Sequence, residues 1–172
     1  GTFVAVAGIE QGLNRIVSFT EDMRRRGLRP GTEVISASVI PAPQEIARKL
    51  QVPVGEDLAR CERLRLADGE PLSLEISHLV LRYCPGILQK NYAERPLREE
   101  LEQSYNIYLV RAHQTIHATV ANKKLSKQLL VPSGAPLFYI ERVSYSQQDI
   151  PVEFLQLYHR GDRYALYNEL RG

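Results

Sequence analysis

The sequence has 172 residues, 44% of them hydrophobic and 24% charged, which is typical of an ordinary globular domain. Lys and Arg total 22 against 20 Asp and Glu, so the net charge of +2 argues against a module that grips nucleic acid by itself. Two cysteines are too few for a disulfide framework, and no apolar run approaches the roughly 20 residues that span a bilayer. We therefore expect one compact, cytoplasmic domain without a membrane segment.

The first half of the chain predicts short helices between strands. A helix is expected to begin near Ser18 or Thr20, with acidic residues in its first turn, and to end at Gly27. Residues 43–50 predict a second short helix. Strands are expected at 34–40, 58–66 and 71–83, and the Asp68-Gly69 pair between the last two is a hairpin signal.

The second half predicts more strands than helices. Residues 97–105 and 122–130 are expected to be helical, and the acidic residues of the first of these to face outward: Glu99, Glu100 and Glu102. Strands are expected at 108–121, 137–146, 151–160 and 164–167. The hairpins are frequent and no βαβ unit repeats, so the sequence predicts an α+β domain whose sheet is mainly antiparallel, with flanking helices.

Arg63 and Arg65 are the first candidates for a binding site. They are two residues apart in a predicted strand and therefore share one face of the sheet. Two guanidinium groups on one face suit an anionic ligand, although alternating arginines more often lie on a solvated face. Glu75, across the hairpin, fits either a contact to ligand hydroxyl or amino groups or a cross-strand ion pair of little worth if exposed.

The start of the first helix is a second candidate. Free N–H groups there can hold a phosphate or carboxylate, with added hydroxyl groups from Ser18 and Thr20. A plain helix cap without a ligand is the simpler interpretation of these residues alone. The four histidines lie apart on predicted strands, and their spacing does not form a zinc pattern, so we expect neither a metal site nor a cofactor.

An ordered set of segments resembles the UTRA domain, the ligand sensor of HutC-type regulators in the GntR superfamily. The resemblance begins with the Ser-Phe-Thr-Glu-Asp-Met segment at 18–23 and covers residues 16 to 167. It continues through Pro41-Ala42, Arg63-Leu64-Arg65, Asp68-Gly69-Glu70-Pro71, Glu75, Pro151-Val152-Glu153 and Arg160-Gly161-Asp162-Arg163-Tyr164. No single motif is decisive, but their order and spacing are specific.

The resemblance implies the organisation of the whole protein. Residues 1–5 are similar to the last strand of a winged helix-turn-helix wing, 6–15 would be a linker, and 16–172 the sensing and dimerising domain. It implies a chorismate-lyase-like fold, a homodimer, a small-molecule effector and operator DNA bound through an N-terminal domain absent from this chain.

The resemblance also implies which residues bind the effector, which we expect to be a phosphorylated sugar or amino sugar, or another small anion. Similar sensors use the Phe-Thr segment for phosphate, here Phe19 and Thr20. The implied set is Ser18, Phe19, Thr20, Arg63, Arg65, Glu75, Arg98, Glu153 and His159. Two departures concern the ligand: His159 stands where an aromatic hydroxyl is expected, and Pro96 and Arg98 replace a serine and a tyrosine.

Three functions follow from these features. The leading one is an effector-sensing domain, without enzymatic activity, of a transcription regulator, expected to be a repressor. A lyase acting on chorismate is the rival, because the implied fold also serves that enzyme and Arg63 and Arg65 suit its carboxylates. The third is a dimerisation module that binds no ligand.

Overall fold

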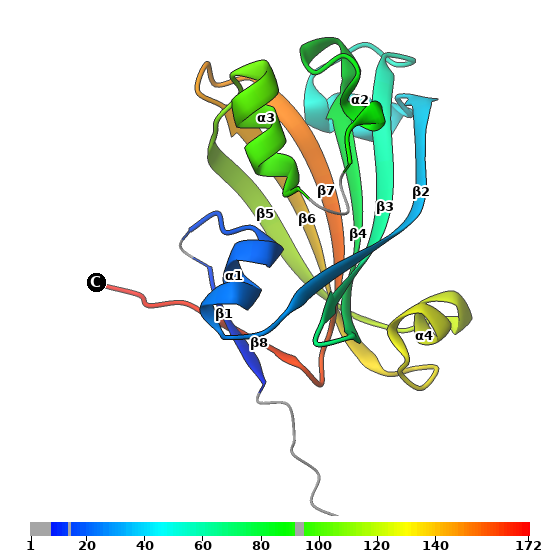
Figure 1. The fold of residues 1–172 in the computed structure, drawn as a ribbon, viewed down its shortest axis with the longest axis vertical. Helices are drawn as coiled ribbons and strands as arrows, with labels where there is room; N and C mark the ends of the chain where they lie inside the picture. Colours follow the sequence, from blue (N-terminus) through cyan, green and yellow to red (C-terminus); the bar gives the residue numbers. More distant parts are fainter. Residues whose placement is uncertain (1–7, 14, 92–94) are drawn as a thin grey trace, which may run out of the picture.

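A six-stranded antiparallel sheet forms the centre of the computed structural model, which describes residues 8–13, 15–91 and 95–172 (Figure 1). The α+β class expected from the sequence is confirmed. From one edge to the other the strands are β2 (Pro30–Pro41), β3 (Asp57–Ala67), β4 (Glu70–Val80), β7 (Pro151–Arg160), β6 (Pro136–Ser146) and β5 (Leu109–Val120). The hairpin between β3 and β4 turns at Asp68 and Gly69, whose φ angles of 49° and 80° are those that Asp-Gly supplies.

Two faces of this sheet are covered by different helices. Helix α1 (Phe19–Arg25) and helix α3 (Leu97–Tyr105) lie over one face, in front of the strands in Figure 1. Leu101 of α3 packs there against Cys61 and Val152. Helices α2 (Gln44–Leu50) and α4 (Lys123–Leu129) pack on the other face, and 3-10 turns at Leu81–Tyr83 and Ile87–Gln89 follow β4.

A short parallel pair, β1 (Ile9–Gly12) and β8 (Tyr164–Tyr167), stands apart from the main sheet. The sequence predicted a linker at 6–15, whereas residues 9–12 form this strand. The strand is held because Ile9, 1% exposed, enters a core cluster with Met23, Leu72 and Tyr164. The wing expected at residues 1–5 lies outside the described residues.

The orientation of Glu100 also differs from expectation. We expected it to face outward, but its side chain is buried and accepts hydrogen bonds from Arg95 Nη1, at 3.0 Å, and from the Ser104 hydroxyl. The chain before α3 supplies the cation that makes this burial tolerable. In the part of the chain that the structure describes, no helix has the length and apolar character needed to cross a bilayer.

Candidate functional site

Arg63, Arg65 and Glu75 form a buried ionic cluster beneath α1 and α3. Adjacent strands bring them together, because Arg63 lies directly opposite Glu75 in the β3–β4 register. Arg63 Nη2 donates to Glu75 Oε2 at 2.9 Å, and Arg65 Nε lies 3.5 Å from the same oxygen. The two arginines are each 4% exposed, so the solvated face considered from the sequence alone is wrong.

The electrostatics of the two buried carboxyl groups differ. Burial by itself would raise the pKa of Glu75, but the Arg65 and Arg63 guanidinium groups outweigh it and hold that pKa below its ordinary value. Burial raises the pKa of Glu153, with partial opposition from the Ser77 hydroxyl, which donates to Glu153 Oε2 at 2.5 Å. The pKa of Glu75 is therefore the lower of the two and that of Glu153 the higher.

Several donors of the two arginines have no hydrogen-bond partner among the described residues. They are Arg63 Nε, Arg63 Nη1 and Arg65 Nε, and all are buried. Buried polar groups are normally paired, and unpaired cationic donors cost the most. The cluster is thus able to donate several charge-assisted hydrogen bonds to the oxygens of an anion.

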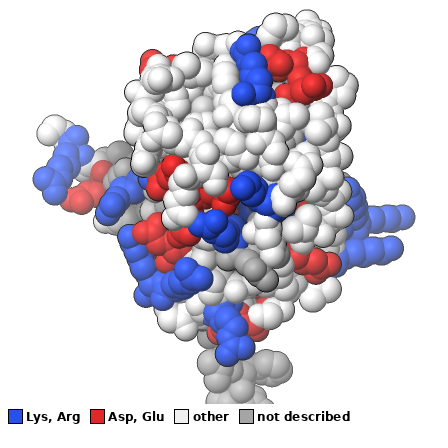
Figure 2. Space-filling view, turned by 45° about the horizontal axis from the view of Figure 1, so that its top comes forward, with Lys and Arg blue, Asp and Glu red and all other residues white. Residues whose placement is uncertain are grey.

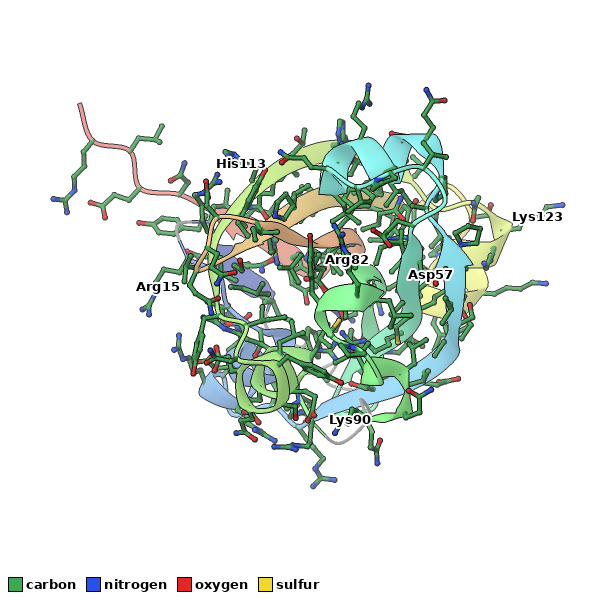
Figure 3. The ribbon with its side chains drawn as sticks, turned by 90° about the horizontal axis from the view of Figure 1, so that it is seen from above. Arg15, Asp57, Arg82, Lys90, His113 and Lys123 are labelled. Atoms are coloured by element: carbon green, nitrogen blue, oxygen red, sulfur yellow. The ribbon has the colours of Figure 1, made fainter. Side chains whose placement is uncertain are left out.

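These side chains border a small, partly open cavity of about 80 Å³. Of the site residues expected from the sequence, the cavity brings together Ser18, Phe19, Arg63, Arg65, Glu75, Arg98 and Glu153. Two open hollows of about 720 and 550 Å³ adjoin it and share Ile16 and Arg98 with it. Figure 3 looks down on the molecule from above, with the sheet curving round the interior and Arg15, which lines both hollows, at the periphery.

The segment at Ser18 closes one side of the cavity. Ser18 caps α1 by accepting a hydrogen bond from the Glu21 N–H at 3.2 Å, as the helix-start pattern predicts. Phe19 turns inward over Arg65, with 4.9 Å between the guanidinium carbon and the ring centroid. Thr20 lines the larger hollow instead of the cavity. Arg98 Nη1 donates to the Ile16 carbonyl at 3.0 Å and ties the segment before Ser18 to α3.

His159, like Thr20, is an expected site residue that does not border the cavity. Its Nδ1 lies 2.5 Å from Ser73 Oγ, and its ring stacks on Tyr164 with centroids 4.0 Å apart. Burial lowers the pKa of His159 to about 3, so the imidazole is neutral. The neighbouring Tyr164 carries a phenol hydroxyl, which accepts from Ser73 Oγ at 3.3 Å.

Sequence reasoning missed Arg142 and Ser144, which border the cavity from β6. Arg142 lies opposite Leu155 of β7 and Gln114 of β5. The alternation of residues 137–146 placed Arg142 and Ser144 on one face of a strand, but the sequence does not show which strands become neighbours. The pairing of β6 with β7 determines that these two side chains lie at the cavity.

Charge is mixed over the surface of the molecule. Figure 2 shows acidic and basic side chains next to each other, without one dominant patch of either sign on that face. Within residues 8–13, 15–91 and 95–172, no group of three His, Cys, Asp or Glu side chains is placed to hold a metal ion.

Comparisons with known proteins agree on one family. A family model described as the UTRA domain matches residues 25–165. The chain is 32% identical over 165 residues to the transcriptional repressor NagR of Bacillus subtilis strain 168, across 96% of this chain and 68% of that relative. It is 31% identical over 162 residues to the repressor PhnF of Mycolicibacterium smegmatis, across 94% of this chain and 66% of that relative.

A solved structure matches over nearly the whole chain. The effector domain of PhnF from Mycobacterium smegmatis superimposes with a TM-score of 0.88 at 29% identity, covering 95% of this chain and 100% of that domain. The chain spans about two thirds of the length of the two repressors, 68% and 66%. The matched part therefore corresponds to the effector domain rather than to a whole repressor.

Proposed function

The chain belongs to the UTRA domain family, as an effector domain of GntR-type transcription regulators rather than an enzyme, and on that premise we propose that it senses a small anionic metabolite. The chorismate-lyase alternative loses its support, because the relatives are transcriptional repressors.

The pair of buried arginines carries this proposal. Arg63 and Arg65 keep unpaired donors at a cavity, and their shared partner Glu75 balances only one of two positive charges. A bound anion would neutralise the remaining positive charge and accept hydrogen bonds from the unpaired donors. A phosphorylated sugar or amino sugar fits best, because Glu75 and Glu153 offer acceptors for its hydroxyl or amino groups.

Arg65 also gives a physical route from the ligand to the N-terminal side of the domain. Its guanidinium group contacts Phe19 of α1, and Phe19 packs against the cluster that holds Met23 and Ile9. A ligand that draws Arg65 into the cavity changes its contact with Phe19, and so shifts the balance between two positions of α1 and β1. Coupling of this kind is a difference in ligand affinity between two arrangements.

The proposal also covers the parts of the regulator outside this domain. We place this effector domain in a cytoplasmic, homodimeric, HutC-type repressor whose N-terminal winged helix-turn-helix domain binds operator DNA. Effector binding at the Arg63–Arg65 cavity then alters operator affinity. Light scattering of the purified domain should give twice the mass of one chain.

A thermal-shift screen against sugar phosphates, amino-sugar phosphates and small carboxylates tests the site. A ligand at about 100 times its Kd adds roughly 2.7 kcal/mol, which raises the Tm of a domain of this size by about 5–10 °C. Arg65→Lys keeps the charge but loses the planar fork, so it should bind the same ligand at least about tenfold more weakly.

Arg60→Gln is the matched control, because Arg60 lies on β3 but on the opposite face from Arg63 and Arg65. It should bind like the wild type. A screen in which no small anion raises the Tm would favour the dimerisation module without ligand. A ligand whose affinity is equal in the Arg65→Lys and wild-type proteins would place the site elsewhere.

A further inference from the structure

A second cationic group borders the cavity at the side away from Arg63 and Arg65. It consists of Arg142 on β6 and Arg98 on α3, and both line the cavity and the adjoining hollow of about 550 Å³. Arg142 and Arg63 lie on strands separated by β4 and β7. Three strand spacings separate their backbones by about 14 Å.

Arg142 has an unusual partner for a partly buried cation. Its Nε and Nη2 both donate to Gln114 Oε1, at 3.1 and 3.0 Å, and Gln114 is a neutral amide. Arg142 forms no ion pair within residues 8–13, 15–91 and 95–172. Burial lowers the pKa of Arg142 even though Glu153 and Glu75 oppose that shift. A partly desolvated charge without a carboxylate partner is costly unless a ligand neutralises it.

Charge balance separates the two ends of the site. At one end Arg63 and Arg65 share a single carboxylate, Glu75, which leaves one positive charge. At the other end Arg98 is paired with Glu102, at 3.3 Å, whereas Arg142 has no such pair. Arg63 and Arg65 thus share one ion-paired carboxylate and Arg142 has none among the described residues, while Glu153, whose pKa burial raises, is the remaining acidic residue that borders the cavity.

We propose that the effector carries two anionic groups on a short carbon skeleton, one bound by Arg63 and Arg65 and the other by Arg142 and Arg98. A sugar bisphosphate or a phosphorylated sugar acid has this chemistry. The inference rests on the proposed function, since it specifies the ligand of the same site. It goes beyond that function in two ways: it assigns a ligand contact to Arg142, and it requires a second anionic group on the ligand.

The entry of such a ligand into the cavity depends on the contact between Arg98 and the backbone at Ile16. A cavity of about 80 Å³ is too small for a sugar phosphate. It adjoins the two open hollows, however, because Ile16 and Arg98 line all three. The hydrogen bond from Arg98 Nη1 to the Ile16 carbonyl lies on this border. An anion that takes over Arg98 releases that carbonyl and widens the cavity toward the hollow.

Inorganic phosphate is the first probe, and the readout is the Tm at increasing phosphate and constant ionic strength. Two anion sites should make Tm rise about twice as steeply, per tenfold increase in phosphate, as one site does. Arg142→Gln should halve the wild-type slope, Arg65→Gln should halve it likewise, and Arg60→Gln should leave it unchanged.

Two outcomes of the phosphate experiment overturn the inference. One is an Arg142→Gln slope equal to that of the wild type, and the other is a wild type whose Tm does not respond to phosphate. A chain that binds one anion through Arg65 alone keeps the proposed function and loses this inference, so the two failures are distinguishable.

A matched ligand pair provides the second test. Calorimetric titration should give fructose 1,6-bisphosphate at least about tenfold tighter binding than fructose 6-phosphate, because only the former reaches both ends. Arg142→Gln should reduce that preference to about twofold or less. Equal affinity of the wild type for both sugars, or an Arg142→Gln variant with full preference, contradicts the assignment.

Discussion

Arg65 connects the cavity to helix α1 through the ring of Phe19, 4.9 Å from its guanidinium carbon. The same guanidinium group donates to Thr32 Oγ1 at 2.8 Å and lies 3.5 Å from Glu75. Arg65 therefore contacts α1, the edge strand β2 and the ionic cluster at once. A ligand that reorients this one side chain acts on all three elements.

Phe19→Leu should uncouple α1 from the ligand. The variant keeps an apolar side chain in the core but removes the ring under Arg65, a contact worth about 0.5–2 kcal/mol. Hydrogen exchange of the amides in Phe19–Arg25 should slow when ligand binds the wild type, and should change much less in the variant.

Phe138→Leu is the control for this experiment, because Phe138 packs against the same core cluster as Phe19. It should retain the wild-type response of α1 to ligand. Exchange in α1 that slows equally in the Phe19→Leu and wild-type proteins would show that the signal does not pass through Phe19.

Substitutions in the ionic cluster should have unequal effects on stability. Glu75→Gln leaves both Arg63 and Arg65 buried without a carboxylate, which should cost about 3–5 kcal/mol. Arg63→Met leaves the contact between Arg65 and Glu75 in place, so it should cost about 1–3 kcal/mol. Urea denaturation at neutral pH measures both, and a larger loss in Arg63→Met would contradict the shared role of Glu75.

Acid should destabilise the domain partly through His159. Its folded-state pKa of about 3 lies below the ordinary value near 6.5, so the unfolded chain takes up the proton first. The stability due to neutral His159 is complete above pH 6.5 and is lost as pH falls toward 3. At pH 5.5 the loss is about 1.4 kcal/mol relative to neutral pH.

His159→Phe should remove that part of the pH dependence. The difference in unfolding free energy between pH 7.5 and 5.5 should shrink by about 1.4 kcal/mol in urea titrations. His78, whose pKa burial lowers to about 4, should behave in the same way when it is changed to Phe. An unchanged difference in both variants would mean that neither imidazole is held neutral.

The two thiols should be nearly inert in the folded protein. Cys61 and Cys84 are buried, and burial raises the pKa of both, to about 12 for Cys84. Ellman's reagent at pH 8 should react about 100-fold or more slowly with native protein than with denatured protein. The single variants Cys61→Ser and Cys84→Ser assign any residual rate, and fast labelling of Cys84 would contradict its place in the core.

Local chemistry in the sequence determined much of the architecture. The helix at 97–105 and the strands at 151–160 and 164–167 have the predicted bounds, because caps, turn residues and alternation act over a few neighbours. The same alternation placed Arg63 and Arg65 on one face. It could not show whether water or a helix covers that face, and the packing of α1 and α3 decided this.

Contacts between distant segments decided the rest. Arg142 faces the cavity because β6 pairs with β7, and His159 turns to Ser73 and Tyr164 because β7 also pairs with β4. Glu100 is buried because the chain brings Arg95 to it, and residues 9–12 form a strand because β8 lies beside them. In each case the free energy of burial depends on a partner that sequence spacing does not identify, so only the tertiary structure could place it.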